Sequence, residues 1–253
     1  MSGKINSASR LVGLLEKTLD CPEGDETLIV WCKVLDISNT QNKLRCVHEV
    51  TQAVNLMYME LAVIKAAMIS TDISSNLYHP HIERIEAALS MEALNSQWVH
   101  RKQYLKADTV LALKWCIEIL PDEESLILSE ELKKLAESVE ELLTAISTST
   151  LPEHLKALMR RHASLVKSAI VHYPITGAKA LQAALSQGLG DMFMAADELK
   201  KADTGSAEVI SKWKQVWMVV GKATDGVVKT DKFITSATKL IENGIKILEN
   251  FNP

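Results

Sequence analysis

Histidines and carboxylates at short spacing are the first residues in this sequence that could do chemistry. His79 and His81 form an H-x-H pair with Glu83 close by, and zinc accepts all three side chains as ligands. A zinc site needs three or four ligands in a fixed shell, and the sequence supplies no second histidine or cysteine cluster to complete one. We therefore predict no metal site, and we interpret this segment as the polar start of a surface helix.

A basic patch in the second half of the chain is the next candidate. The region from 122 to 141 has the opposite charge, with eight acidic residues against two lysines. Opposite charges in two parts of one chain can pair with each other, or each can attract a partner. The sequence leaves both alternatives open, together with a simple solvated helix face. The basic patch lies on one predicted helix and consists of Lys156, Arg160, Arg161, His162 and Lys167.

Three pairs of adjacent carboxylates occur, Glu123-Glu124, Glu130-Glu131 and Glu140-Glu141. Neighbouring residues on a helix point about 100° apart, so these pairs do not converge as a general acid and base would. The sequence also lacks a G-x-S-x-G elbow, a G-x-x-x-x-G-K-[ST] phosphate loop and a G-x-G-x-x-G turn. We predict no catalytic residue and no cofactor. An enzyme with an unrecognised helical site is an alternative, and it would show a polar pocket that holds His100 or His162 beside a carboxylate.

The element expected to position the others is a helix over 177–200. Pro174 should end the preceding helix, and Thr176 can cap a new one that starts at Gly177. Positions four apart share a helix face, so this helix has a smooth stripe beside a leucine ridge that lets another backbone come close. We predict that it is the buried middle helix of the protein. The stripe is Ala180, Ala184 and Gly188, and the ridge is Leu181, Leu185 and Leu189.

Apolar residues recur at helical spacing along the rest of the chain, and no segment alternates over a strand's length. The sequence therefore predicts an all-α fold, a multi-helix bundle of about eight to eleven helices. A polar segment at 147–152 ends in proline and separates an acidic helix from a basic one. It predicts an N-terminal bundle over 1–147 and a C-terminal region over 152–253, packed as one body. Helices are expected near 7–19, 26–37, 40–70, 80–98 (with or without a break near Ser90), 108–120, 129–146, 152–172, 177–200, 206–220 and 231–250.

The composition excludes some classes of protein. The 253 residues are 47% hydrophobic and 24% charged, as in ordinary globular proteins, and a net charge of −4 argues against nucleic-acid binding. Cys32, Cys46 and Cys116 lie in apolar helical patterns, which favours a reducing compartment. The first ten residues contain no apolar signal core, and the longest apolar run is shorter than the roughly 20 residues of a membrane span. We expect a cytoplasmic protein.

The segment Tyr173-x-Ile175-x-Gly177-x-x-x-Leu181, followed by Ala184-Leu185 and Leu189-Gly190, resembles a group of bacterial all-helical proteins of unassigned function. The resemblance extends in outline to the helix around Trp31 and to the glycine-interrupted C-terminal region. It implies a bacterial source and an all-helical fold. It implies no active-site residue, because the shared motif concerns packing.

These observations predict a non-enzymatic protein that acts by protein–protein interaction as an adaptor, regulator or accessory subunit. Its partner would be another protein or a second copy of the chain. The alternative is a membrane-acting effector of an abortive anti-phage defence system, because Trp213 and Trp217 lie one turn apart among lysines in the amphipathic C-terminal helices. We favour a core or protein interface for these tryptophans. The predicted interaction residues are Glu130, Glu131, Glu137, Lys156, Arg160, Arg161, Trp213 and Trp217.

Overall fold

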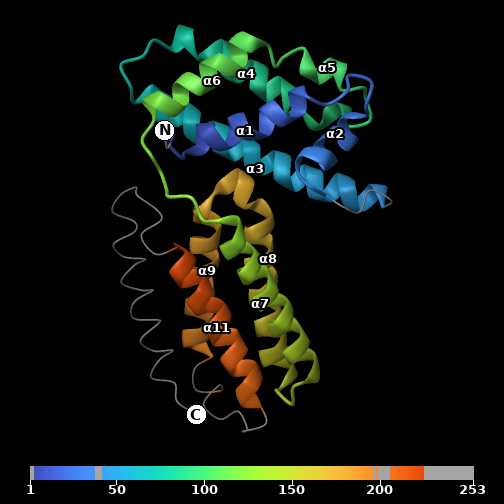
Figure 1. The fold of residues 1–253 in the computed structure, drawn as a ribbon, viewed down its shortest axis with the longest axis vertical. Helices are drawn as coiled ribbons and strands as arrows, with labels where there is room; N and C mark the ends of the chain where they lie inside the picture. Colours follow the sequence, from blue (N-terminus) through green and yellow to red (C-terminus); the bar gives the residue numbers. More distant parts are fainter. Residues whose placement is uncertain (1–2, 38–41, 196–197, 199–205, 225–253) are drawn as a thin grey trace. The chain divides into compact units, whose positions relative to one another are not determined.

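The computed structural model describes residues 3–37, 42–195, 198 and 206–224, and over these residues it confirms the all-α prediction (Figure 1). Ten α-helices and two short 3-10 helices occur in the described part, and the extended pairing there is one isolated bridge between Glu26 and Gln97. The chain divides into two compact units. Unit 1 comprises residues 1–123 and 174–176, and unit 2 comprises 124–173 and 177–253.

Unit 1 begins with a helix that caps itself. The Asn6 side chain accepts a hydrogen bond from the backbone N–H of Ser9, and the Ser9 hydroxyl accepts one from the backbone N–H of Asn6. This reciprocal pair satisfies two N–H groups that the first turn leaves without helical partners. The helices of unit 1 are α1 (Ser7–Leu19), α2 (Thr27–Val34), α3 (Lys43–Ile69), η1 (Ser75–Leu77), α4 (His79–Ala88), η2 (Met91–Ala93), α5 (Val99–Lys102) and α6 (Ala107–Ile119).

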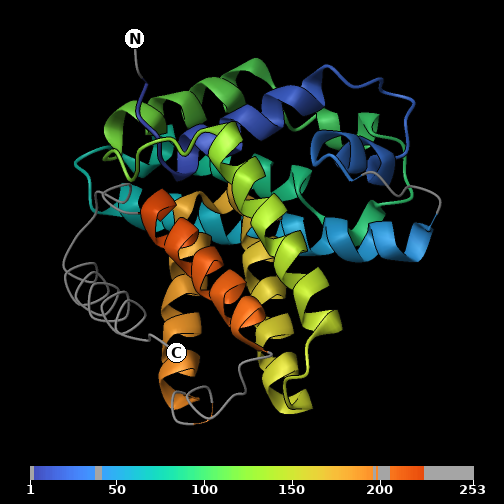
Figure 2. The same ribbon diagram turned by 60° about the horizontal axis from the view of Figure 1, so that its bottom comes forward.

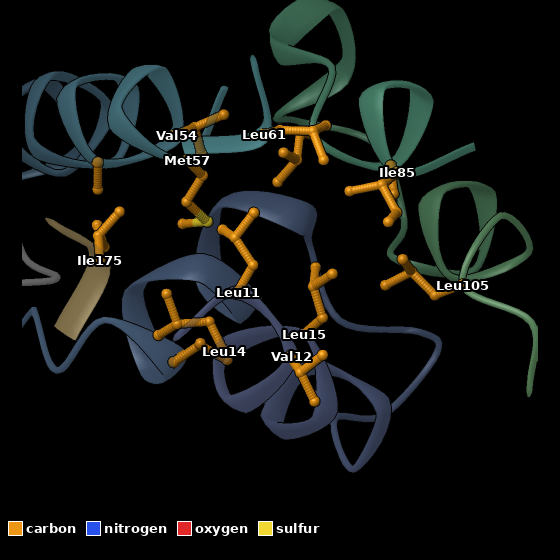
Figure 3. Close-up of a cluster of buried hydrophobic side chains, with 14 of the residues drawn as sticks. Leu11, Val12, Leu14, Leu15, Val54, Met57, Leu61, Ile85, Leu105 and Ile175 are labelled. Carbon is orange, nitrogen blue, oxygen red and sulfur yellow. The ribbon is translucent and has the colours of Figure 1, made fainter. Parts of the chain in front are cut away.

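Helix α1 is the centre of unit 1 because it packs against both α3 and α6 (Figure 1). Its leucines point toward apolar side chains of α3, and Leu11 lies opposite Met57 in the close-up (Figure 3). The predicted long helix is confirmed as α3, whose 27 residues extend about 40 Å at 1.5 Å per residue. The buried side chains of this core include Leu11, Leu14, Leu15, Val54, Met57, Leu61, Ile85 and Ile175.

A buried ion triad joins α1 to the rest of unit 1. The Arg10 guanidinium donates to Glu60 on α3 over 2.7 Å and to Glu123 over 3.0 Å, and all three side chains are about nine-tenths buried. Arg10 Nε also donates to the carbonyl of Ile175 over 2.9 Å. Because a buried charge is tolerated only when it is paired, the triad fixes one register of α1 against α3.

Helix α3 is also the one helix in the described ranges that is long and apolar enough to cross a membrane. Length and composition are weak grounds for such a span, because a core helix passes the same test. In this fold the buried side of α3 runs from Cys46 to Met68, and it includes the ion-paired Glu60. Helix α3 therefore contributes one buried face to the core of unit 1.

Unit 2 consists of helices that run side by side over the described residues (Figure 2). Helix α11 packs against both α7 and α9. The predicted central helix is confirmed as buried in α9, where Leu181 and Leu185 are fully covered and Gly188 faces the indole ring of Trp217. The described helices are α7 (Ser129–Thr148), α8 (Glu153–Thr176, of which 174–176 belong to unit 1), α9 (Ala178–Met194) and α11 (Ala207–Thr224).

The break before α9 differs from the prediction. Helix α8 continues through Pro174 and ends two residues later at Thr176, although Pro174 has no N–H to donate to the preceding turn. Gly177 makes the break with φ 63°, a left-handed conformation that suits glycine. The Glu124 carboxylate then accepts a hydrogen bond from the backbone N–H of Ala178 over 2.6 Å, the role that the sequence assigned to Thr176. This distant cap could not be found from local sequence.

The division of the chain also lies elsewhere than the sequence suggested. The structure divides at 123/124, whereas the predicted seam at 147–152 is the connection between α7 and α8 inside unit 2. Leu142 and Ile146 on one side of that connection share a core with Leu155 and Met159 on the other. A polar segment ending in proline marks a tight helical connection here. The predicted helix over 231–250 lies outside the described residues.

Candidate functional site

The acidic residues predicted to bind a partner lie on α7 of unit 2. Glu130, Glu131 and Glu137 are exposed, and Glu131 accepts a hydrogen bond from the backbone N–H of Leu128 at the start of the helix. The last two acids of this helix, Glu140 and Glu141, form ion pairs with Lys167 and Lys212 at 2.6 and 3.0 Å. Part of the acidic region therefore forms ion pairs within unit 2. Such pairing within the chain was one of the alternatives that the sequence left open.

Two of the predicted basic residues on α8 form ion pairs with acidic side chains of unit 2. Arg160 bonds to Glu153 over 2.6 Å, and this hydrogen bond holds the pKa of the Glu153 carboxyl below its ordinary value. Arg161 pairs with Asp191 of α9, while Lys156 is half-buried. Exposed pairs of this kind add little stability, but they leave few unmatched charges to attract a partner.

Trp213 and Trp217 require a correction as interaction residues. Both lie in the core of unit 2, with 1% and 0% of their surface exposed, so α11 presents neither to a partner nor to lipid. Burying each indole removes roughly 150–250 Å² from water, which explains why α11 turns this face inward. The core alternative holds for both tryptophans. Over 207–224, the tryptophan face that the membrane alternative requires is therefore buried in the unit. Residues 225–253 lie outside the described part.

His162 is a buried histidine that contacts a carboxylate. It lies on α8 and is 1% exposed. Its Nε2 is 3.0 Å from Oδ2 of Asp191 on α9, and its Nδ1 is 3.2 Å from Nε1 of Trp213 on α11. The Trp217 ring meets the imidazole edge-on, with ring centroids 5.3 Å apart. One polar side chain thus links three helices.

The hydrogen bonds of His162 define its protonation. An indole N–H can only donate, so Nδ1 accepts from Trp213, and Nε2 must carry the proton given to Asp191. Burial lowers the pKa of His162 against the opposing effect of Asp191, so the neutral form is favoured. Both ring nitrogens are occupied and the ring is covered, so His162 has no lone pair to offer a substrate. The geometry indicates a structural role for His162, which holds three helices together.

An apolar groove in unit 1 is the feature with binding geometry. It encloses a hollow of about 250 Å³ between the end of α3, the segment that follows it, and one side of α6. Of its lining residues, Glu118 alone is charged. The others are Met68, Ile73, Leu77, Tyr78, Ala112, Trp115, Cys116 and Ile119.

Large apolar side chains stand exposed around this hollow. Trp115 is 54% exposed and Leu77 is 56% exposed, whereas the other four tryptophans of the chain are at most 1% exposed. Scattered exposed leucines are ordinary, but a group of them around a hollow marks a site of interaction. The exposed residues at the groove and next to its lining are Ile69, Ile73, Leu77, Leu111, Trp115 and Ile119.

The chemistry of the groove suits binding rather than catalysis. Cys116 is the one thiol in its lining, and burial raises the pKa of that thiol to about 11, which keeps it protonated and unreactive. The hollow is smaller than the roughly 300–1,000 Å³ of small-molecule sites, so it fits one large apolar group. Within the described residues no three histidine, cysteine or acidic side chains come together as a metal site.

The groove could not be predicted from the sequence, because helical spacing does not show which apolar residues of the 108–120 helix are covered. The structure divides them: Leu113 and Cys116 face the core of unit 1, while Leu111, Trp115 and Ile119 form a second, outward face. The signal was present, since a helix that is apolar on both faces needs a second partner. Which of the two faces would be covered could not be read from spacing.

Comparison with known proteins adds no assignment to this geometry. The chain matches no protein-family model, no curated protein and no solved structure.

Proposed function

We propose that this chain is a protein-binding subunit or adaptor without catalytic activity, and that it holds its partner in the groove of unit 1. The observation that carries the proposal is the group of exposed large apolar side chains around an apolar hollow, with Trp115 at its edge. Tryptophan is enriched among the residues that dominate binding energy at protein interfaces. An apolar partner side chain that enters the hollow would complete the packing around Trp115.

This proposal moves the contact surface from unit 2 to unit 1. Glu140 and Glu141 of α7 and Arg160 and Arg161 of α8 are matched by ion pairs within unit 2, and the tryptophans of unit 2 are in the core. The groove has the opposite character, because its apolar surface lacks cover in the folded unit. The buried cysteines Cys32, Cys46 and Cys116 fit a reducing, cytoplasmic setting, and the sequence resemblance supports a bacterial source.

The test compares partner capture by matched variants of the full chain in its native cell. Trp115→Ala should lose a protein that the wild type retains, whereas Leu128→Ala should keep it, because Leu128 is an equally exposed residue of unit 2. The captured protein is then purified and titrated against wild type. Since Trp115 is the exposed tryptophan, binding should shift its emission to the blue and protect it from acrylamide.

We expect Trp115→Ala to weaken this binding by about tenfold or more, the effect of losing a central aromatic anchor. Equal binding by Trp115→Ala and wild type would refute the groove as the contact surface. Equal loss with Leu128→Ala would show that the capture reflects general apolar adhesion rather than a site.

A further inference from the structure

We infer that the occupant of the groove is an amphipathic α-helix of a partner protein, with basic residues beside its apolar anchors. This inference rests on the proposed function and specifies the partner's chemistry. Leu111, Trp115 and Ile119 form an exposed ridge on α6, and Trp115 and Ile119 of this ridge line the groove. These residues are four apart, so they lie on one face and extend about 12 Å, the length of roughly two helical turns.

A second helix packs against such a ridge by placing its own side chains in the flanking groove. Ile73 and Leu77 form the opposite wall, so an inserted apolar side chain meets carbon on both sides. An extended peptide would need an open sheet edge to pair its backbone, and the described residues of unit 1 contain no strand. A helix satisfies its own backbone and needs only apolar cover, with anchors at i and i+4.

The charges at the rim of the groove indicate which residues should flank the apolar anchors of the partner helix. Asp72 precedes the lining residue Ile73, Glu118 lies in the lining, and neither carboxylate forms an ion pair in the described part of the chain. The other two charges on these segments are matched, Asp108 by Arg84 at 2.8 Å and Lys114 by Glu16 at 2.6 Å. Two unmatched carboxylates beside an apolar groove attract lysine or arginine and disfavour anionic lipid.

The test is a selection on the full-length protein with a display library of 16-residue helical peptides. Leucine is fixed at i, i+4 and i+7, and the remaining face varies among lysine, glutamate and glutamine. Peptides are kept when they bind wild type at least about tenfold tighter than Trp115→Ala. We expect lysine to be enriched next to the leucines, and we expect the affinity to fall as salt rises.

The matched variant carries Asp72→Lys and Glu118→Lys together. It should prefer peptides with glutamate flanks and bind the lysine-rich peptides about tenfold or more weakly. Because both carboxylates are exposed, circular dichroism should show an unchanged helical content. Peptides that depend on Trp115 but show no charge preference, in wild type or in the matched variant, would overturn the basic helix and leave the groove as the contact surface.

Three other outcomes would overturn the inference in different ways. If no peptide depends on Trp115, the proposed function fails as well. Concentration-dependent dimerisation that Trp115→Ala abolishes would identify the occupant as a second copy of the chain. Flotation with phosphatidylglycerol vesicles that requires Trp115 would identify it as lipid.

Discussion

The two units of this protein bury their tryptophans differently. Unit 2 covers both of its indoles, Trp213 and Trp217, between helices. Unit 1 covers Trp31 and Trp98, which meet edge to face with centroids 5.8 Å apart, but leaves Trp115 at the rim of a hollow. An exposed aromatic side chain beside an apolar hollow is the feature on which the proposed contact surface rests. Over the described residues, unit 2 therefore covers its tryptophans within its own core, whereas unit 1 leaves one of them exposed.

The polar groups inside the two cores differ as well. Unit 1 buries a charged triad of Arg10, Glu60 and Glu123, whereas unit 2 buries a neutral imidazole, His162, between a carboxylate and an indole. Removing one member of a buried charged set leaves the others unpaired, which costs more than losing one neutral hydrogen bond. Substitutions in each core therefore test this difference between the two units.

The largest effect should come from Arg10→Met. It leaves the carboxylates of Glu60 and Glu123 buried without their cation, and we expect the free energy of unfolding of unit 1 to fall by about 3–5 kcal/mol. Hydrogen exchange of α3 amides measures this directly and separately from unit 2. Arg45→Met is the matched control, since its i,i+4 pair with Glu49 is exposed and its loss should change stability little. A loss below about 1 kcal/mol at Arg10 would contradict a closed, water-free triad.

The next largest effect should come from Gly188→Ala in unit 2. A Cβ there would overlap the ring of Trp217, so α9 and α11 must move apart, at a cost of about 1–3 kcal/mol. Gly190→Ala is two residues away on the same helix, and nothing lies within 4 Å of its new methyl group. It should stabilise by up to about 1 kcal/mol through helix propensity alone. Urea unfolding of both variants tests these opposite signs, and the same sign in both would refute the close approach.

The third effect is a pH dependence confined to unit 2. Burial lowers the pKa of His162 below the value of about 6.5 expected in the unfolded chain. Between the two pKa values the unfolded chain binds the proton and the folded unit does not, so stability must fall as pH drops below about 6.5. Protonation at Nδ1 would also turn an acceptor into a donor facing the Trp213 N–H.

Hydrogen exchange of α11 amides at pH 7.5 and pH 5.5 should show this loss. His162→Gln keeps a donor for Asp191 and an acceptor for Trp213 but does not titrate, so it should flatten the pH profile. Burial also lowers the pKa of His172, which adds a loss of the same sign, so His172→Gln serves as the companion variant. An unchanged profile in His162→Gln would assign the whole pH dependence to other groups.

Much of this fold could be predicted from the sequence. The features that could not be predicted share a physical cause. Spacing located the long α3, the buried face of α9 and the packing role of Gly188, because helical periodicity records which face is covered. It could not find Glu124 as the cap of α9, or Arg10 as the partner of Glu60, because these contacts join residues far apart in sequence. The groove could not be predicted from the sequence for a related reason. Spacing shows that α6 is apolar on two faces, but only the folded unit shows that one of them is left uncovered.

The smallest effect on stability should come from Trp115→Ala, and that small size is informative. A buried tryptophan replaced by alanine costs about 3–5 kcal/mol, as we expect for Trp31→Ala. Trp115 has more than half of its surface in water, so its loss should cost unit 1 less than about 1 kcal/mol, measured by urea unfolding. A side chain that stabilises its own fold so little, yet lies at the rim of an apolar hollow, fits the proposed role in binding. A stability loss near that of Trp31→Ala would instead make Trp115 part of the core, and the contrast between the two units would disappear.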